Sequence, residues 1–338
     1  MFENKRKISK LLLRACKLSV GSSLAIYIAR FLNLEYATTA GTIALLTIAT
    51  TKWGTLRLSL NRIITFFISA FLCGIVFTKV ESDWIAYGIF IFMIVVMCDV
   101  LKWPTVLSVN ALIGMHFLTH MNEYNRDFVF NEFMLLIIGI SISILLNMFH
   151  AYKYEERHLI KCMRNVEIHL KETLLEVSEY LSNHEEGKNA WKDIGNLETE
   201  LEEYIQHATE YQDNTFNSHP GYYIEYFEMR YLQCKILHSL QKEMKKIRTK
   251  PVQAKVIADY IAYLAEYIVE KNVPVEQQTR LELIFENMRK ADLPETREEF
   301  ESRALLYHVL MDLEEFLNCK KRFVENLDEV KLKKYWNS

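Results

Sequence analysis

The distribution of charge-free apolar stretches is the feature that most constrains this chain of 338 residues. Residues 1–152 contain six such stretches and residues 153–338 contain none. They are 18–29, 36–51, 63–78, 84–98, 103–122 and 133–152. A bilayer core needs roughly 20 mostly apolar residues in a helix, which two stretches reach alone and the others reach with their flanks. The sequence therefore predicts a membrane domain with six spans at 1–152 and a water-exposed domain at 153–338.

The second stretch is the least typical of a membrane span, because it is short and rich in threonine. Tyr36 opens it, an aromatic residue at the expected water boundary. The alternative is a re-entrant or partly buried segment, since a short polar stretch falls below the length that a bilayer requires.

Cations between the stretches predict the orientation of the chain. Six lysines and arginines lie in 5–17, three in 52–62, one at Lys102 and three in 153–161. The opposite loops hold few cations and several carboxylates. By the positive-inside rule, we expect a multi-pass protein of the cell membrane with both termini in the cytoplasm.

The residues after 152 predict an all-helical domain. Only three of the ten glycines lie there, and amphipathic stripes recur at three- and four-residue steps, as in Leu170, Leu174 and Val177. We expect helices at 153–184, 191–212, 222–248, 252–271, 275–291 and 295–329. A cytoplasmic antiparallel helical bundle buries these stripes most economically.

The aromatic residues Tyr222, Tyr223, Tyr226 and Phe227 form one helical face in this domain. Such a face is typical of a hydrophobic core. The tyrosine hydroxyl groups also allow a small-molecule pocket with a polar edge. The pattern favours the core and leaves the pocket open.

Several function classes are disfavoured by missing motifs. The sequence has no G-x-x-x-x-G-K-[ST] loop for nucleotide phosphates, and the glycine-poor second half lacks the lid of a sensor kinase. It has no C-x-x-C motif, and His116 and His120 have metal-compatible spacing but no third ligand. We expect no enzyme activity, no metal, no cofactor and no nucleic-acid partner. The six cysteines are expected to be reduced thiols.

Small and polar residues recur at four-residue intervals within the apolar stretches. Examples are Ser19, Ser23 and Tyr27 in the first, Asn110 and Gly114 in the fifth, and Gly139, Ser143 and Asn147 in the sixth. Such stripes favour close helix packing. Several of them in one bundle also suggest a polar-lined path, because polar groups facing lipid are costly.

Three ionisable residues are candidates for chemistry. Arg57 and Arg62 form a cationic approach to the third stretch, which fits either membrane topology or attraction of an anion. Asp99 lies at the inner end of the fourth stretch and is a candidate for proton binding. The simpler interpretation of Asp99 is an interfacial ion pair with Lys102.

Residues 19–74, SVGSSLAIYIARFLNLEYATTAGTIALLTIATTKWGTLRLSLNRIITFFISAFLCG, resemble the first half of the bacterial aromatic acid exporter family, which is related to fusaric acid resistance transporters. The likeness lies in the small-residue first span, the Ala/Gly/Thr-rich second span and the cationic segment before the third. In that family an arginine at the start of the third span is soon followed by glycine. Here Ile63, Ile64 and Thr65 follow Arg62, and the next glycine is Gly74.

The resemblance extends to the whole plan of six spans followed by an aromatic acid exporter C-terminal domain. It implies export of small aromatic carboxylic acids, driven by an ion gradient, with protons as the coupling ion. A carboxylate needs a cation and a ring needs an apolar wall. Arg57 or Arg62 would bind the carboxylate and Tyr27, Phe66 or Phe67 would contact the ring, while Asn110 lies on the substrate path.

Six spans per chain also suggest a homo-oligomer that encloses the path. The alternative function is a non-transporting scaffold or regulator, whose spans anchor it in the lipid bilayer while the cytoplasmic bundle binds a partner.

Overall fold

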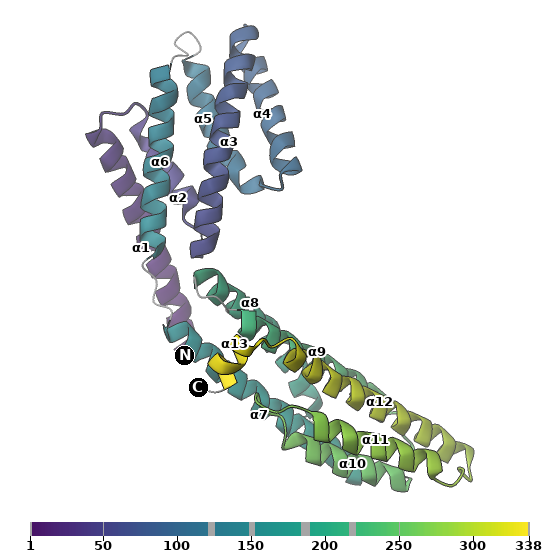
Figure 1. Ribbon diagram of the computed structural model, residues 1–338. Coiled ribbons are helices and arrows are strands. Elements are labelled where there is room, and N and C mark those ends of the chain that lie inside the picture. The colour runs from purple at the N-terminus through teal and green to yellow at the C-terminus, as the bar shows by residue number, and fades with distance from the viewer. Residues whose placement is uncertain are drawn as a thin grey trace. The chain divides into compact units, whose positions relative to one another are not determined.

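The computed structural model describes residues 2–49, 51–120, 126–148, 153–183, 190–215, 221–249 and 251–336. Within these residues the regular structure is helical and contains no strand (Figure 1). The chain divides into two compact units, residues 1–151 and 152–338. Each unit has its own hydrophobic core.

The first unit contains α1 (Phe2–Phe31), α2 (Ala37–Thr47), α3 (Lys52–Lys79), α4 (Asp83–Val100), the 3-10 turn η1 (Pro104–Val106), α5 (Leu107–Thr119) and α6 (Arg126–Met148). Among the described residues, four helices are long and apolar enough to span a membrane: the Leu11–Phe31 part of α1, and α3, α4 and α6. The second and fifth stretches form shorter apolar helices. Helix length thus supports four of the six expected spans.

Helix α2 is short because the backbone leaves the helical conformation at both of its ends. Tyr36 precedes it with a left-handed backbone at φ 54°, and Ile48 follows it in an extended conformation. Its 11 residues cover about 16 Å at 1.5 Å per residue, roughly half of a bilayer core. The threonine-rich stretch that looked least like a span forms the shortest of the main helices in this unit.

Small residues let α2 pack closely against both α1 and α6; Figure 1 shows the three helices in the first unit. Ala25 and Ala29 of α1 meet Ala40 and Ala44 of α2 in one fully buried cluster. Gly139 of α6 lies so close that an added Cβ would be 2.9 Å from the Ala40 carbonyl oxygen. Helix α3 packs against α4, α5 and α6 in a separate cluster, whose buried rings include Phe66, Phe90 and Phe117.

The second unit contains α7 (Lys153–Asn183), α8 (Ala190–Asn214), α9 (Gly221–Met244), α10 (Val252–Ala265), α11 (Val275–Lys290), α12 (Arg297–Glu325), α13 (Glu329–Lys331) and the last turn η3 (Leu332–Trp336). The six long helices match the expected ranges to within a few residues, except that α10 ends at Ala265. The amphipathic stripes of α7 and α12 are buried in a common core, as their spacing predicts.

The aromatic face of α9 belongs to that core. Tyr222, Tyr223, Tyr226 and Phe227 are at most 2% exposed. The tyrosine hydroxyl groups donate to carboxylates. Tyr222 donates to Glu270 Oε1 at 2.5 Å, and Tyr226 donates to Glu167 Oε1 at 3.0 Å. Burial and these neighbouring carboxylates raise the pKa of both phenols, so both stay neutral donors. The core interpretation of the cluster is confirmed.

A matched pair of glycine substitutions tests the packing of α2. Gly139→Ala places a methyl group against Ile43 and the Ala40 carbonyl, and overpacking of this kind costs about 1–3 kcal/mol. Gly88→Ala on α4 meets no atom within 4 Å, so the same methyl group there leaves stability unchanged or raises it slightly. Unfolding of the purified protein in a denaturing-detergent titration measures both. Equal stability of the two variants would contradict the close α2–α6 contact.

Candidate functional site

The guanidinium of Arg62 binds the carboxyl end of α2. It lies on α3, is 2% exposed, and donates from Nη1 to Thr47 Oγ1 at 2.6 Å and from Nη2 to the Leu46 carbonyl at 2.9 Å. A third contact reaches the Ile43 carbonyl at 3.3 Å. The last carbonyls of a helix lack intrahelical partners and carry partial negative charge. Arg62 therefore satisfies the end of α2 with both hydrogen bonds and opposite charge.

Polar residues of α6 bind the backbone on the other side of the same break. Asn147 Nδ2 donates to the Thr51 carbonyl at 2.8 Å and to Thr55 Oγ1 at 2.7 Å. It also reaches the Ala49 carbonyl at 3.3 Å, while Ser143 Oγ donates to the Ala44 carbonyl at 3.0 Å. Backbone groups outside a helix must find partners when lipid surrounds them. The polar stripe on the sixth stretch thus supports the break between α2 and α3.

A second polar cluster lies at the amino end of α2. The side chain of Asn131 in α6 bonds both backbone groups of Glu35: Oδ1 accepts from its N–H at 2.9 Å, and Nδ2 donates to its carbonyl at 3.2 Å. These two bonds hold the turn in which Tyr36 has a positive φ of 54°. A left-handed backbone costs a non-glycine residue about 1–2 kcal/mol. The turn is therefore a locally strained position, held by contacts from α6.

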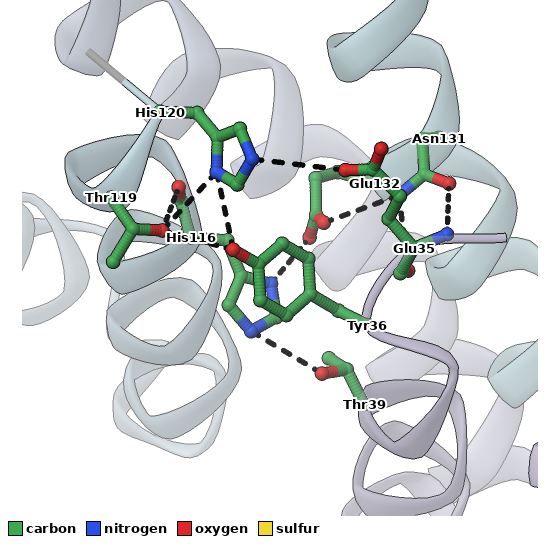
Figure 2. A network of polar contacts seen from close by, with 8 residues as sticks. All are labelled: Glu35, Tyr36, Thr39, His116, Thr119, His120, Asn131 and Glu132. Carbon is green, nitrogen blue, oxygen red and sulfur yellow. Dashed lines mark hydrogen bonds and ion pairs between the residues drawn. The ribbon is translucent and has the colours of Figure 1, made fainter.

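The centre of this cluster is a buried pair formed by His116 of α5 and Glu132 of α6 (Figure 2). His116 Nδ1 lies 2.9 Å from Glu132 Oε2, and Glu132 is fully buried. On the other side of the ring, His116 Nε2 lies 3.3 Å from Thr39 Oγ1 in α2. The ring of Tyr36 stacks on the imidazole with centroids 4.2 Å apart. Three helices therefore converge on one titratable pair.

His120 connects this cluster to solvent. Its Nδ1 lies 3.2 Å from the Tyr36 hydroxyl, and its Nε2 lies 3.8 Å from Glu35 Oε2 (Figure 2). The Glu35 side chain is 65% exposed, whereas that of His120 is 25% exposed. Titratable groups thus extend from the exposed surface to the fully buried Glu132.

The hydrogen bonds of the His116–Glu132 pair differ between the neutral and the protonated imidazole. With a neutral imidazole, Nδ1–H donates to the carboxylate and Nε2 accepts from the Thr39 hydroxyl. With a protonated imidazole, both nitrogens donate, and the Thr39 hydroxyl can rotate to accept. A buried charge is stable only when paired and hydrogen-bonded, so a change in protonation here changes the contacts of α2.

The structure separates the residues that the sequence nominated. Tyr27, Arg57 and Asp99 have exposed side chains, as do Ser19 and Ser23 of the first stripe. The buried face of α1 is instead the Gly21, Ala25 and Ala29 face. The exposed side chains of Tyr27, Arg57 and Asp99 therefore face away from the packed interior of the first unit.

Arg62, Phe66 and Asn110 are buried and belong to the interior. Phe66 lies one turn after Arg62 on α3, is fully buried, and contacts Phe133 with ring centroids 5.5 Å apart. Asn110 lies on α5, which packs against α3, and its Nδ2 has no hydrogen-bond partner within the described residues. Three of the predicted residues are therefore buried on two helices, α3 and α5, that pack against each other.

Sequence reasoning missed the roles of Glu132, Thr39 and Tyr36. Glu132 stands immediately before the sixth charge-free stretch and was counted with the loop, although α6 begins at Arg126. The sequence does contain a signal for this site: Glu132 borders one apolar stretch, and His116 and His120 lie inside another. Ionisable residues within membrane spans are rare and are usually functional. The partner could not be inferred, since 16 positions separate His116 and Glu132.

Two family models match nearly the whole chain. "Aromatic acid exporter family member 1" matches residues 9–150, and "Putative aromatic acid exporter C-terminal domain" matches residues 156–321. The chain belongs to the aromatic acid exporter family. The fold and the apolar helices agree with a multi-pass membrane protein of an exporter family.

Two individual proteins are similar to this family member. An uncharacterized protein, YqjA, of Bacillus subtilis (strain 168) is 28% identical over 317 residues, covering 92% of this chain and 95% of that protein. A crystal structure of a membrane protein from Clostridium difficile 630 matches with 20% identity and a TM-score of 0.44, covering 49% of this chain and 99% of that one.

The role of Arg62 in holding α2 is testable against its exposed neighbour. Arg62→Met removes three contacts to the end of α2 and leaves the part-buried Leu46 carbonyl without its donor, at about 1–3 kcal/mol for an unsatisfied group. Arg57→Met, on the exposed side of the same helix, should stay within about 0.5 kcal/mol of the unmodified protein. Detergent unfolding measures the difference, and an equally stable Arg62→Met variant would contradict the capping role.

Proposed function

We propose that this family member exports small aromatic carboxylic acids from the cytoplasm in exchange for protons. The observation that carries the proposal is the fully buried Glu132, paired with His116 inside the membrane unit of an exporter-family chain. Burying a carboxylate and an imidazole is costly, and such residues within spans mark proton relays.

Glu132 is the proposed proton-binding group, ahead of Asp99. Asp99 is exposed at the end of α4, so its protonation would change few contacts in the interior. Protonation at Glu132 would change the bonds that join α5, α6 and, through His116, Thr39 of α2. A group that couples transport to protons has to bias the conformation, which requires different contacts in its two protonation states.

Arg62 and Phe66 are the proposed substrate residues. Within the part of the chain that the structure describes, Arg62 contacts only neutral oxygens and its Nε has no hydrogen-bond partner. The end of α2 offers it only partial negative charge and none of its contacts is a carboxylate, so part of its positive charge remains to attract a substrate carboxylate. Phe66 lies one turn further on the same buried face and would contact the ring, with the unsatisfied Asn110 Nδ2 as a further donor on the path.

The proposed role of Arg57 is to attract the substrate anion electrostatically before it binds. It is exposed near the start of α3, on the side that the distribution of cations assigns to the cytoplasm. An exposed cation raises the local concentration of anions in a manner that salt screens. We also propose that two or more copies of the chain enclose the path, because α2 and α5 are shorter than a bilayer core.

Transport in inverted membrane vesicles tests the proposal. Energised inverted vesicles acidify their lumen, and passive weak acids accumulate away from an acidic compartment. Accumulation of labelled aromatic acids in the acidic lumen therefore requires a carrier. The expected result is accumulation that disappears when the proton gradient is collapsed. If no tested acid accumulates in vesicles that contain the protein, the chain is better explained as a membrane-anchored scaffold.

Two isosteric substitutions distinguish the proton-binding candidates. Glu132→Gln keeps the size of the side chain but removes its proton-binding carboxylate, and should reduce gradient-driven accumulation at least tenfold. Asp99→Asn makes the same change at an exposed position and should retain most of the flux. Protein levels in the vesicles serve as the control. The reverse pattern would assign coupling to Asp99 and refute the role of Glu132.

A further inference from the structure

The second unit contains a small cavity with two buried cations in its wall. The cavity, of ≈ 20 Å³, lies between α9, α12 and the segment that joins α10 to α11. Arg230 is 1% exposed and Lys320 is 4% exposed. The remaining wall is largely apolar, with Leu264, Ile268 and Phe316 among its residues. Two cations in an apolar wall are unusual, because burying charge is costly unless it is paired.

Arg230 is only partly satisfied by the protein. Its Nε donates to the Tyr226 hydroxyl at 3.2 Å, and its Nη1 donates to Gln233 Oε1 at 2.9 Å. Its Nη2 has no hydrogen bond within the described residues and lies 3.6 Å from Glu167 Oε1, close enough for an ion pair but too far for a good hydrogen bond. One N–H edge of a buried guanidinium is thus left for another acceptor.

Lys320 has similar spare capacity. Its ammonium donates to the Glu270 carbonyl at 2.5 Å and lies 5.0 Å from the centre of the Phe323 ring and 5.6 Å from that of the Trp336 ring. An ammonium has three donors, so two have no hydrogen bond within the described residues. Burial first, and then repulsion by Arg230, hold the pKa of Lys320 well below its usual range.

The charges around the cavity do not cancel when all groups are ionised. Arg230 and Lys320 are joined by Arg164, which pairs with Glu167 at 2.8 Å and with Glu270 at 3.0 Å. These three cations face two carboxylates, Glu167 and Glu270. Among the described residues, this group of five therefore keeps one positive charge in excess when all of them are ionised, and the partly satisfied Arg230 and Lys320 both line the cavity.

We propose that this cavity is a binding site for a small monovalent anion, held between Arg230 Nη2 and Lys320 Nζ. The ligand is of the size of chloride. A volume of about 10–15 Å³ of this kind holds one water-sized group, so the cavity of ≈ 20 Å³ takes one or two such groups and excludes acetate and an aromatic ring. The site is therefore distinct from the proposed substrate path and does not depend on it.

One further polar atom in the wall lacks a partner and fits an anion with one water beside it. Gln277 Oε1 is buried and has no hydrogen-bond partner within the described residues. A water between it and the anion would donate to both. Tyr267 and Asn272 are the half-buried residues of the wall, and they offer the route for entry. A bound anion would also favour the protonated form of Lys320 and join α9 to α12.

Thermal unfolding of the full-length protein in detergent tests the site at constant ionic strength. The probe is sodium chloride, compared with sodium acetate, sulfate and benzoate. We expect chloride to raise the unfolding midpoint of the second unit by about 3–6 °C at ten times its Kd. Acetate, sulfate and benzoate should not produce this shift. This selectivity is measured on the unmodified chain, so the test does not depend on any variant folding.

A matched pair of lysine substitutions locates the effect. Lys320→Met removes one of the two proposed ligands, and the shift should disappear. Lys321→Met removes the exposed neighbouring cation, and the shift should be retained. The proposal is overturned if chloride does not shift the midpoint, if acetate, sulfate or benzoate acts equally, or if a folded Lys320→Met variant responds like the unmodified protein.

Discussion

The packing of the first unit depends on the contacts that hold the two ends of the short helix α2. A helix of 11 residues is shorter than a bilayer core, so the backbone groups at its ends need partners from the neighbouring helices. At its carboxyl end, Arg62 and Asn147 supply the missing donors from α3 and α6. At its amino end, Asn131 fixes the preceding turn and Thr39 contacts His116. Without these contacts the break between α2 and α3 would leave the part-buried carbonyls of Leu46 and Ala49 without these donors, at about 1–3 kcal/mol for an unsatisfied group.

The same contacts place the two ionisable groups of the proposed mechanism at opposite ends of one element. The cationic Arg62 lies at the carboxyl end of α2, which the helix dipole makes partially negative. The titratable His116–Glu132 pair lies near the amino end. Because α2 contacts both, a change in protonation at one end and a carboxylate at the other can bias the same helix. In the proposed exporter, this arrangement would couple the binding of a proton to the binding of the substrate through α2.

The sequence predicted much of this architecture and little of the site. Hydropathy located the apolar helices, and amphipathic spacing located the six long helices of the second unit, because both patterns are local. The weak second stretch was recognised from its threonines, but its helix length was not, since the breaks at Tyr36 and Ile48 are set by contacts with α6 and α3. The pairing of His116 with Glu132 joins different helices and leaves no local pattern. Arg62 was nominated for its charge, and its role at the end of α2 was visible only in three dimensions.

The central claim is that Glu132 changes its protonation state when the carrier works. Infrared difference spectroscopy on the reconstituted protein measures this directly, because a protonated carboxyl group has a carbonyl stretching band that a carboxylate lacks. Adding an aromatic acid at constant pH should change that band in the unmodified protein, and the change should be absent in Glu132→Gln and present in Asp99→Asn. An unchanged band in the unmodified protein, or an identical signal in Glu132→Gln, would contradict the account.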